Sequence, residues 1–459
     1  MTGKSAIAAL SALGATVSSV DARDRDATFT DLAPERIVDY NLVIASPGWQ
    51  PGHPLLQAAI SAEIPVWSEL ELAWKLQVSR HDGERAPWLV VTGTNGKTTV
   101  VTMLAHILSS AGLNAPAVGN VGKSLIEAAL DPTVDALVVE ASSFQLHFTH
   151  SISPLGAAII NVTPDHLNWH GSFEAYAAAK ARVFTNVQAA AFYPVQDELI
   201  KDLLIAAEVC EGARAVGVTN GIPVYGNIGI VGEVICDRAF VPGDTKIERS
   251  KEAVSLATTT DLVAFADSEG FVPAHILLDT LIACGLARTL EVAPEAISAA
   301  LRTYSPQSHR VELVLRNSFG VSFIDDSKAT NPGATLSALQ SYPSAKVVWI
   351  AGGQSKGVDF DTLIPLVSQS LKAVILIGED GPKLADSLTR FAPQIPLQVL
   401  KDKDGRQAMQ KAVTLASRAA DAAGDIVLLS PACASLDQFS SYSDRGNAFQ
   451  DAVNAQEQG

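Results

Sequence analysis

The segment GTNGKTT at residues 93–99 contains the residue types of a phosphate-binding loop at an unusual spacing. The common loop places four residues between the two glycines of G-x-x-x-x-G-K-[ST], whereas here only Thr94 and Asn95 separate them. The lysine would neutralise the β- and γ-phosphates of a nucleoside triphosphate, and the threonine after it would bind Mg²⁺. The ATP contacts expected from this loop are Gly93, Thr94, Asn95, Gly96, Lys97, Thr98 and Thr99.

The flanking residues predict that this loop joins a strand to a helix. WLVVT, which precedes the loop, is a short apolar run typical of a buried parallel strand. Apolar residues then recur on one helical face, and Gly112 can end the helix. Backbone N–H groups and the helix dipole at such a junction favour an anion. A glycine-rich turn without a nucleotide is the alternative, which this context disfavours.

Three further residues could serve a metal-assisted phosphoryl transfer. Glu140 ends the apolar run VDALVVE, so its carboxylate would point into the same crevice as the loop. His166 follows the run GAAIINV, and Lys180 lies in the alanine-rich helix AYAAAKARV. Each also has an ordinary interpretation, as a turn cap, a structural histidine and a solvated helix lysine respectively. Spacing alone does not make Lys180 catalytic.

Strand-like and helix-like runs alternate through most of the 459 residues, which predicts an α/β fold with parallel sheets. The polar stretches RHDGERAP and YSPQSHR are interpreted as linkers, and they divide the chain into domains at 1–85, 86–306 and 307–459. In the first domain, KSAIAALSALG predicts a helix and ATVSSVD a strand. In the last, Ser435 is expected to open a helix after the strand DIVLLS, at an anion-binding N-terminus.

The composition excludes several classes of function. The net charge of −16 disfavours a nucleic-acid partner, because a duplex binder needs a basic face. The four cysteines form no C-x-x-C pair, so they predict neither a zinc site nor a disulfide framework, and they fit a reducing cytoplasm. No apolar run is long enough for a membrane span, and the first residues do not have the pattern of a signal peptide.

Several motifs together resemble the Mur ligases, which build the peptide stem of bacterial peptidoglycan. These are GTNGKTT, EASSFQL, NVTPDHL and YAAAKARVF, of which the first is shared with folylpolyglutamate synthetases. In the last third, HRVE, DDSKATNPGAT, GGQSKGVDF and LSPACASLDQFSSYSDRG resemble the branch of the family that adds D-glutamate. The resemblance implies a Rossmann-like N-terminal domain, a central P-loop ATPase-type parallel sheet and a Rossmann-like C-terminal domain. It also implies a cytoplasmic monomer that serves cell-wall synthesis, and through it cell shape and cell division.

The reaction implied by the resemblance is the ligation of D-glutamate to UDP-N-acetylmuramoyl-L-alanine. The γ-phosphate of ATP passes to the acceptor carboxylate, and the amine of D-glutamate attacks the acyl phosphate. The chemistry is reasonable in itself, because a carboxylate is a poor electrophile until phosphorylation supplies a leaving group. Two anions must also be held in contact, so cations have to offset their repulsion.

Two Mg²⁺ ions are implied. Thr98 and Glu140 would hold the first, and His166 and Lys180 the second. Since an ammonium cannot bind a cation, the resemblance implies that Lys180 is carbamoylated, which requires a neutral amine and a lowered pKa.

The remaining site residues follow from the resemblance alone. The third domain would close over ATP through His309, Arg310, Asp326 and Lys328. D-Glutamate would be held by Thr330, Lys356, Ser435 and Tyr442. The UDP-sugar would be held by Asp21, Arg23, Ser46, Gly48 and Asn120.

The chain departs from the family pattern in two places. Near the expected adenine site the family often has a His-Asn pair and a second Asn, whereas here His275 is followed by Ile276 and Asp279. The chain also begins inside a turn that the family places after its first strand. We therefore expect a natural start upstream, with about ten or more residues preceding Met1.

Two alternatives remain open from the residues. One is another amino-acid ligase of the same superfamily, which DDSKATNPGAT and SPACASLDQF disfavour. The other is a nucleotide-gated switch, in which ATP drives a conformational change. A ligase would release phosphate only with both the acceptor and the amino acid present.

Overall fold

The computed structural model describes residues 2–22, 24–243, 245–266, 272–342, 344–355, 357–358 and 360–457. Two of the expected binding residues, Arg23 and Lys356, lie outside the described residues. The chain forms two compact units, one of Met1–Leu262 with Leu277–Tyr304 and one of Val263–Ile276 with Ser305–Gly459. The finer division at 1–85, 86–306 and 307–459 stays a prediction.

The first unit begins with a small two-stranded parallel sheet. Its elements are α1 (Thr2–Ala12), η1 (Pro34–Asp39), β1 (Val43–Ile44), α2 (Pro54–Ser61), β2 (Val66–Trp67) and α3 (Glu69–Leu76). The predicted helix at the start is confirmed, but the strand predicted at ATVSSVD is wrong, since only an isolated bridge joins Val20 to Phe29. The reason is local: Ser19 and Thr28 each accept the other's backbone N–H through the side chain, which replaces a ladder.

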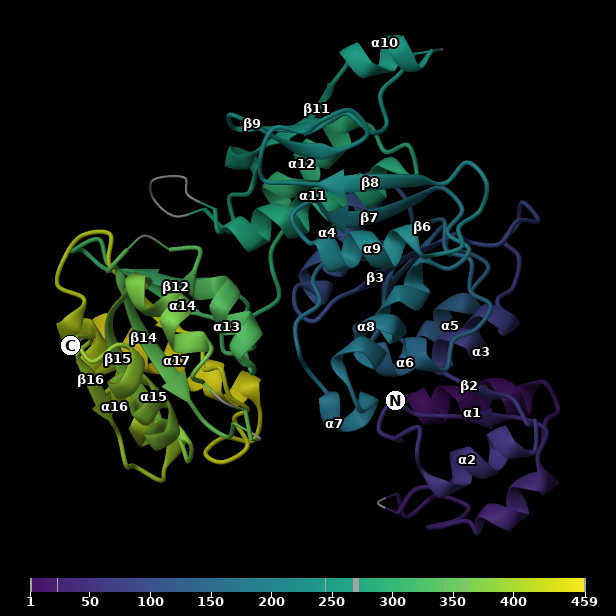
Figure 1. The fold of residues 1–459 in the computed structure, drawn as a ribbon, viewed down its shortest axis with the longest axis horizontal. Coiled ribbons are helices and arrows are strands. Elements are labelled where there is room, and N and C mark those ends of the chain that lie inside the picture. The colour runs from purple at the N-terminus through teal and green to yellow at the C-terminus, as the bar shows by residue number, and fades with distance from the viewer. Residues whose placement is uncertain are drawn as a thin grey trace. The chain divides into compact units, whose positions relative to one another are not determined.

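The nine-stranded central sheet of the first unit has the order β11-β10-β9-β8-β7-β6-β3-β5-β4. Its strands are β3 (Trp88–Thr92), β4 (Ala117–Gly119), β5 (Leu137–Glu140), β6 (Gly156–Ile159), β7 (Ala190–Pro194), β8 (Arg214–Val218), β9 (Ile228–Val231), β10 (Val234–Asp237) and β11 (Val254–Thr258). The pairs from β4 to β9 are parallel, and β9-β10-β11 are antiparallel (Figure 1). β3 lies between β5 and β6, so the segments that follow these three strands meet at one edge.

Helices connect the strands of the central sheet. They are α4 (Lys97–Ser110), α5 (Leu125–Ala129), α6 (Ser143–His147), α7 (Leu167–His170), α8 (Phe173–Ala181), η2 (Arg182–Phe184), α9 (Glu198–Ile205), α10 (Lys246–Lys251), η3 (Thr259–Asp261), α11 (Ala274–Arg288) and α12 (Pro294–Thr303). The strand and helix predicted around the loop are confirmed as β3 and α4. Gly112, just beyond α4, has the left-handed φ of 87° expected of a helix stop.

The second unit contains a six-stranded sheet of order β12-β13-β17-β14-β15-β16, parallel except at β12. Its strands are β12 (Glu312–Arg316), β13 (Ser322–Asp325), β14 (Val347–Gly352), β15 (Leu371–Ile377), β16 (Leu397–Val399) and β17 (Ile426–Leu429). Its helices are α13 (Pro332–Leu339), α14 (Leu363–Val367), η4 (Ser368–Ser370), α15 (Gly381–Phe391), α16 (Gly405–Ala419) and α17 (Tyr442–Glu457). Apolar clusters cover both faces of the sheet.

The predicted α/β class with parallel sheets is confirmed. The four strands predicted in the last third are present as β13, β14, β15 and β17. Among the described residues, no helix has both the length and the apolar character needed to cross a bilayer.

Close packing of α11 on the central sheet depends on Gly285. A Cβ at this position would lie 2.4 Å from Cε1 of Phe192 on β7. We predict that Gly285→Ala lowers the free energy of unfolding of the first unit by about 1–3 kcal/mol, because one methyl group overpacks the core. Gly3→Ala, in α1 with open space around it, is the matched control and should not destabilise. Thermal unfolding of the two variants tests this, and equal midpoints would contradict it.

Candidate active site

The 93–96 turn is held by an asparagine that follows β6. Asn161 Oδ1 accepts the backbone N–H groups of Thr94 and Asn95 at 3.0 and 2.8 Å. Gly96, the N-cap of α4, has a φ of 82°, a conformation that favours glycine. The loop therefore reaches the N-terminus of α4 in a fixed conformation, with the helix dipole behind it.

Two lysines donate hydrogen bonds to this loop. Lys97 Nζ bonds to the carbonyl oxygens of Gly93 at 2.9 Å and Thr94 at 2.8 Å. Lys180 Nζ, from α8, bonds to the same Gly93 oxygen at 2.7 Å. The structure therefore brings together two residues that lie far apart in the sequence, of which Lys97 was expected to bind phosphates and Lys180 a second Mg²⁺.

A second cluster lies at the ends of β4 and β5. Thr98 Oγ1 donates to Glu140 Oε2 at 2.6 Å, and Asn120 Nδ2 donates to Glu140 Oε1 at 3.0 Å. Hydroxyl and carboxylate oxygens are the ligands that Mg²⁺ prefers, so the expected pair of Thr98 and Glu140 suits that ion. Asn120, expected on the UDP-sugar side, here contacts the carboxylate of this pair.

Lys180 lies in an environment that favours a neutral amine. Its side chain is buried, with 2% of its surface exposed. Burial lowers the pKa of Lys180 well below 10.5, and the neighbouring Lys97 charge lowers it further. Its Nζ also lies 4.7 Å from the centre of the Tyr176 ring. The solvated helix lysine is therefore the wrong interpretation for this residue.

His166 lies in a different setting. It is the N-cap of α7 with a φ of 52°, and 48% of its side chain is exposed. Its Nε2 lies 3.6 Å from Asp165 Oδ2, and its ring packs on Phe144. The ring can therefore be reached from solvent, unlike the Lys180 amine.

Sequence reasoning missed several residues around the loop. Tyr176 lies with its hydroxyl 2.9 Å from Thr94 Oγ1. His170 contacts Ser143 Oγ at 3.0 Å, and burial, with the positive charges nearby, lowers the pKa of His170 to about 4. Asn161 had a usable signal, as a polar residue directly after an apolar strand, but Tyr176 and His170 had none.

Asp279, which stands where the family often has an asparagine, lies beside the phosphate-binding loop. Asp279 is buried in α11, and a Cβ at Gly96 would lie 2.6 Å from its Oδ1. The carboxylate thus packs against the end of the phosphate-binding loop. His275 is also buried; its Nδ1 lies 3.0 Å from Ser341 Oγ, and burial lowers its pKa to about 4.

The residues expected on the UDP-sugar side lie near the small sheet. Ser46 and Gly48 follow β1, and Ser46 accepts the backbone N–H of Trp49 at 3.1 Å. Asp21 follows the Val20–Phe29 bridge and is exposed. All three lie in loops after extended segments, where parallel sheets place their ligands.

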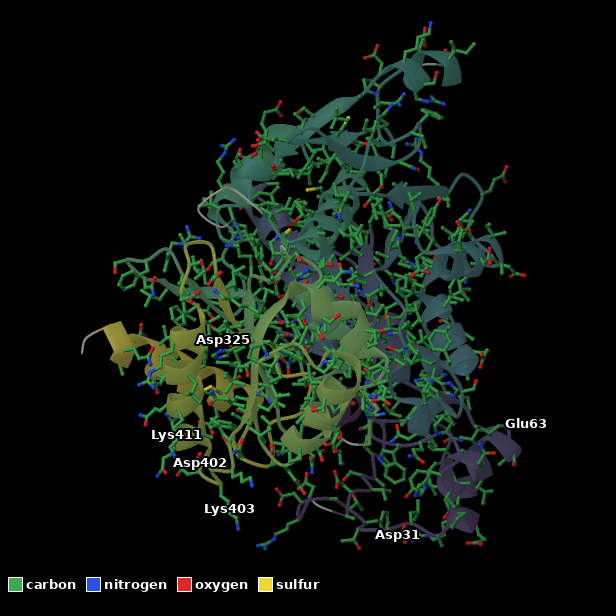
Figure 2. All side chains as sticks on the ribbon, turned by 60° about the vertical axis from the view of Figure 1, so that its left-hand side comes forward. Asp31, Glu63, Asp325, Asp402, Lys403 and Lys411 are labelled. Atoms are coloured by element: carbon green, nitrogen blue, oxygen red, sulfur yellow. The ribbon has the colours of Figure 1, made fainter. Side chains whose placement is uncertain are left out.

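In the second unit, the ring of His309 is buried instead of open to a ligand. Its Nδ1 lies 2.7 Å from Oδ2 of Asp325, which Figure 2 labels. That contact raises the pKa of His309, and a Cβ at Gly446 would lie 2.1 Å from the same Nδ1. Arg310, next along the chain, is half-buried. The ring of His309 is therefore held inside its unit.

Lys328 and Tyr442 are brought together, since Lys328 Nζ lies 3.8 Å from the centre of the Tyr442 ring. Burial alone would raise the pKa of Tyr442, but the charges of Lys328 and Arg310 and the hydrogen bonds to Lys328 and Ser443 together lower it. Asp326 is buried, and although Ser430 Oγ donates to it at 2.9 Å, burial raises its pKa to about 7.

Thr330 follows directly, with its N–H bonded to the Lys328 carbonyl oxygen at 2.8 Å. Ser435 is buried in a single turn, where its carbonyl oxygen accepts the N–H groups of Gln438 and Phe439. The prediction that Ser435 opens a helix is wrong, because the turn does not continue and α17 begins only at Tyr442.

Comparison with known proteins agrees with this geometry. The Mur ligase middle domain matches residues 91–220, and the Mur ligase glutamate ligase domain matches residues 309–433. The UDP-N-acetylmuramoylalanine–D-glutamate ligase of Streptomyces avermitilis is 46% identical over 90% of this chain and 84% of its own length. That of Bifidobacterium adolescentis is 40% identical over 98% of this chain and 94% of its own length.

The chain belongs to the UDP-N-acetylmuramoylalanine–D-glutamate ligases, within the Mur ligases.

Solved structures of other peptide and amino-acid ligases have the same fold. UDP-N-acetylmuramate-alanine ligase of Thermotoga maritima gives a TM-score of 0.55 at 18% identity, with 98% of this chain and 91% of that chain covered. A pseudomurein peptide ligase of Methanothermus fervidus gives 0.58 at 15% identity, with 99% and 98% covered. At these identities the likeness concerns the fold alone.

The burial of Lys180 predicts a pH-dependent stability. Between its lowered folded-state pKa and the unfolded value of 10.5, only the unfolded chain carries the proton, so stability should rise with pH. We predict that Lys180→Met removes up to about 1.4 kcal/mol per pH unit of this rise. Denaturation at pH 7 and pH 9 in buffer free of carbon dioxide measures it. Lys201→Met, at an exposed lysine paired with Glu198, is the control; equal slopes for Lys180→Met and the unaltered protein would contradict the prediction.

Proposed function

We propose that this chain ligates D-glutamate to UDP-N-acetylmuramoyl-L-alanine through an acyl phosphate. As a member of its family it is an ATP-dependent ligase of peptidoglycan precursor synthesis. The observation that supports the substrate assignment best is the 46% identity, over 90% of the chain, to a relative named for this reaction. The loop, the two lysines and the Thr98–Glu140 pair support the phosphoryl transfer.

In the first step, a carboxylate oxygen of the acceptor attacks the γ-phosphorus and the bond to the β-phosphate oxygen breaks, which releases ADP. The negative groups must be held in contact, and Lys97 supplies a charge at the start of α4 for this purpose. The loop N–H groups held by Asn161 would orient the phosphates.

In the second step, the neutral amine of D-glutamate attacks the acyl carbon. The tetrahedral intermediate then loses phosphate and a proton, and the amide forms. Thr330, Lys356, Ser435 and Tyr442 are proposed to hold the amino acid, and hydroxyl and ammonium groups of these types suit its two carboxylates.

Thr98 and Glu140 are proposed to hold one Mg²⁺, and His166 and a carbamoylated Lys180 a second. When bound, the ions neutralise phosphate charge. The buried amine of Lys180 suits carbamoylation, in which the neutral amine adds to carbon dioxide and loses a proton. The modification would convert a potential cation into an anionic oxygen ligand.

The other assignments remain proposals of the same kind. Asp21, Arg23, Ser46, Gly48 and Asn120 are proposed for the UDP-sugar, and Arg310, Asp326 and Lys328 for ATP. His309 is buried, so we propose that it helps to hold the segment of Asp326 and Lys328 in place through its contact with Asp325. We also propose that the enzyme is cytoplasmic and acts as a monomer.

The proposed reaction predicts strict dependence on two co-substrates. Phosphate release from ATP should require both UDP-N-acetylmuramoyl-L-alanine and D-glutamate, and L-glutamate or other D- and L-amino acids should not replace D-glutamate. A continuous phosphate-release assay with this amino-acid panel tests it. Release with ATP alone would instead favour a nucleotide-gated switch, and release with a different amino acid would favour another ligase of the superfamily.

The position of Lys97 predicts a loss of chemistry without a loss of fold. Lys97→Met should lower kcat by about 10²–10³-fold or more, because it removes a charge that stabilises the transferring phosphoryl group. Its thermal midpoint should match that of the unaltered protein. Lys201→Met serves as the control for a lysine far from the loop in sequence and exposed. Near-normal turnover of Lys97→Met would show that the loop assignment is wrong.

A further inference from the structure

Arg445, in the first turn of α17, is a buried cation that the proposed reaction does not yet use. Only 1% of its surface is exposed. Its Nε donates to Ser327 Oγ at 3.0 Å and its Nη2 to the Ser327 carbonyl oxygen at 2.9 Å. Its Nη1 donates to the carbonyl oxygens of Cys433 at 3.1 Å and Gly352 at 3.4 Å. None of these acceptors is a carboxylate.

The acceptors belong to three separate loops. Ser327 follows β13, Gly352 ends β14, and Cys433 lies in the segment after β17. The three strands are neighbours in the order β13-β17-β14 and run parallel, so their carboxyl ends meet at one edge. One guanidinium therefore holds three loops at that edge at fixed positions relative to one another. Its planar shape and five N–H donors suit this role.

Each of these loops continues into a residue proposed for D-glutamate. Ser327 precedes Thr330, and Cys433 precedes Ser435. Gly352 leads into Gln354, which forms an isolated antiparallel bridge with Ala434. The chain then continues to Lys356, which lies outside the described residues.

The fourth proposed residue is tied to the same group. The Oγ of Ser327 donates to the carbonyl oxygen of Tyr442 at 2.8 Å while it accepts from Arg445. The backbone around the guanidinium has little freedom: a Cβ at Gly353 would lie 2.2 Å from the Ala434 carbonyl oxygen and 3.2 Å from Arg445 Nη1. Arg445 thus holds, directly or through Ser327, the described segments that carry Thr330, Ser435 and Tyr442.

We propose that Arg445 is a positioning residue for the D-glutamate site, which sets the spacing of the loops that carry Thr330, Ser435 and Tyr442. This proposal rests on the proposed function. Arg445 acts through the loops, because its donors are already directed to their carbonyl and hydroxyl oxygens. A lysine could keep the charge but could not bridge the three loops, since it lacks the planar fork.

The test is a set of KM values for Arg445→Lys. We expect the KM for D-glutamate to rise about tenfold or more, as the loss of about one strong hydrogen bond would give. The KM for UDP-N-acetylmuramoyl-L-alanine should stay within about twofold of that of the unaltered protein, because no residue proposed for that substrate lies in these loops. The KM for ATP should rise less than that for D-glutamate; some rise is expected because Ser327 lies between Asp326 and Lys328, which are proposed for ATP. An unchanged KM for D-glutamate, or equal rises for all three substrates, would overturn the proposal.

Two further variants keep the test decisive if Arg445→Lys fails to fold. Ser327→Ala is a small change that removes one acceptor of Arg445 and the bond to Tyr442. It should raise the KM for D-glutamate without raising that for UDP-N-acetylmuramoyl-L-alanine. Arg406→Ala removes an exposed arginine that also binds α17, through Asp444 and Asp451, and should leave all three KM values unchanged. An unchanged KM for D-glutamate in folded Ser327→Ala would overturn the proposal.

The amino-acid panel on the unaltered protein tests whether D-glutamate is the substrate, independently of the role of Arg445. If a different amino acid supports turnover, the substrate assignment fails, and the same KM comparison is made with that amino acid. A selective rise then still supports Arg445 as a positioning residue, and its absence overturns it.

Discussion

The carbonyl oxygen of Gly93 accepts hydrogen bonds from two lysine side chains, Lys97 at 2.9 Å and Lys180 at 2.7 Å. Two ammonium charges on one acceptor repel each other, and the more deeply buried group loses its proton more easily. Lys180 is that group, since burial lowers its pKa most and the Lys97 charge lowers it further. Lys180 is therefore the amine that the proposed carbamoylation would need.

The strand order of the central sheet explains why this contact can form. β3 supplies the loop, and its neighbours β5 and β6 supply Glu140 and Asn161 at their carboxyl ends. α8, which follows β6, brings Lys180 back to the Gly93 carbonyl. Ligands of parallel α/β sheets bind at such an edge, and in the second unit the residues proposed for D-glutamate lie in segments that follow β13, β17 and β14.

Much of this arrangement could be predicted from the sequence, because local patterns carry it. The strand and helix around residues 93–99 follow from apolar periodicity, and Thr98 with Glu140 from residue type and place. Contacts made across the fold could not be predicted this way. The burial of Lys180 depends on the packing of α8, and Asp279 reaches Gly96 only because α11 packs closely on the sheet. The prediction of a strand at ATVSSVD was wrong because side-chain hydrogen bonds satisfy the backbone there. The prediction that Ser435 opens a helix was wrong because the chain forms only a single turn at that point.

Lys180 and Arg445, the most deeply buried lysine and arginine among the described residues, show why their residue types differ. Burial lowers the pKa of Lys180 well below 10.5, but lowers that of Arg445 only to about 10, so the guanidinium stays charged at neutral pH. An ammonium is a compact charge that is costly to desolvate, whereas a guanidinium is delocalised and spreads its donors over several acceptors. A lysine therefore suits a position where a neutral amine is needed, as the proposed carbamoylation would require. An arginine suits one where a lasting charge must hold several carbonyl oxygens at fixed distances.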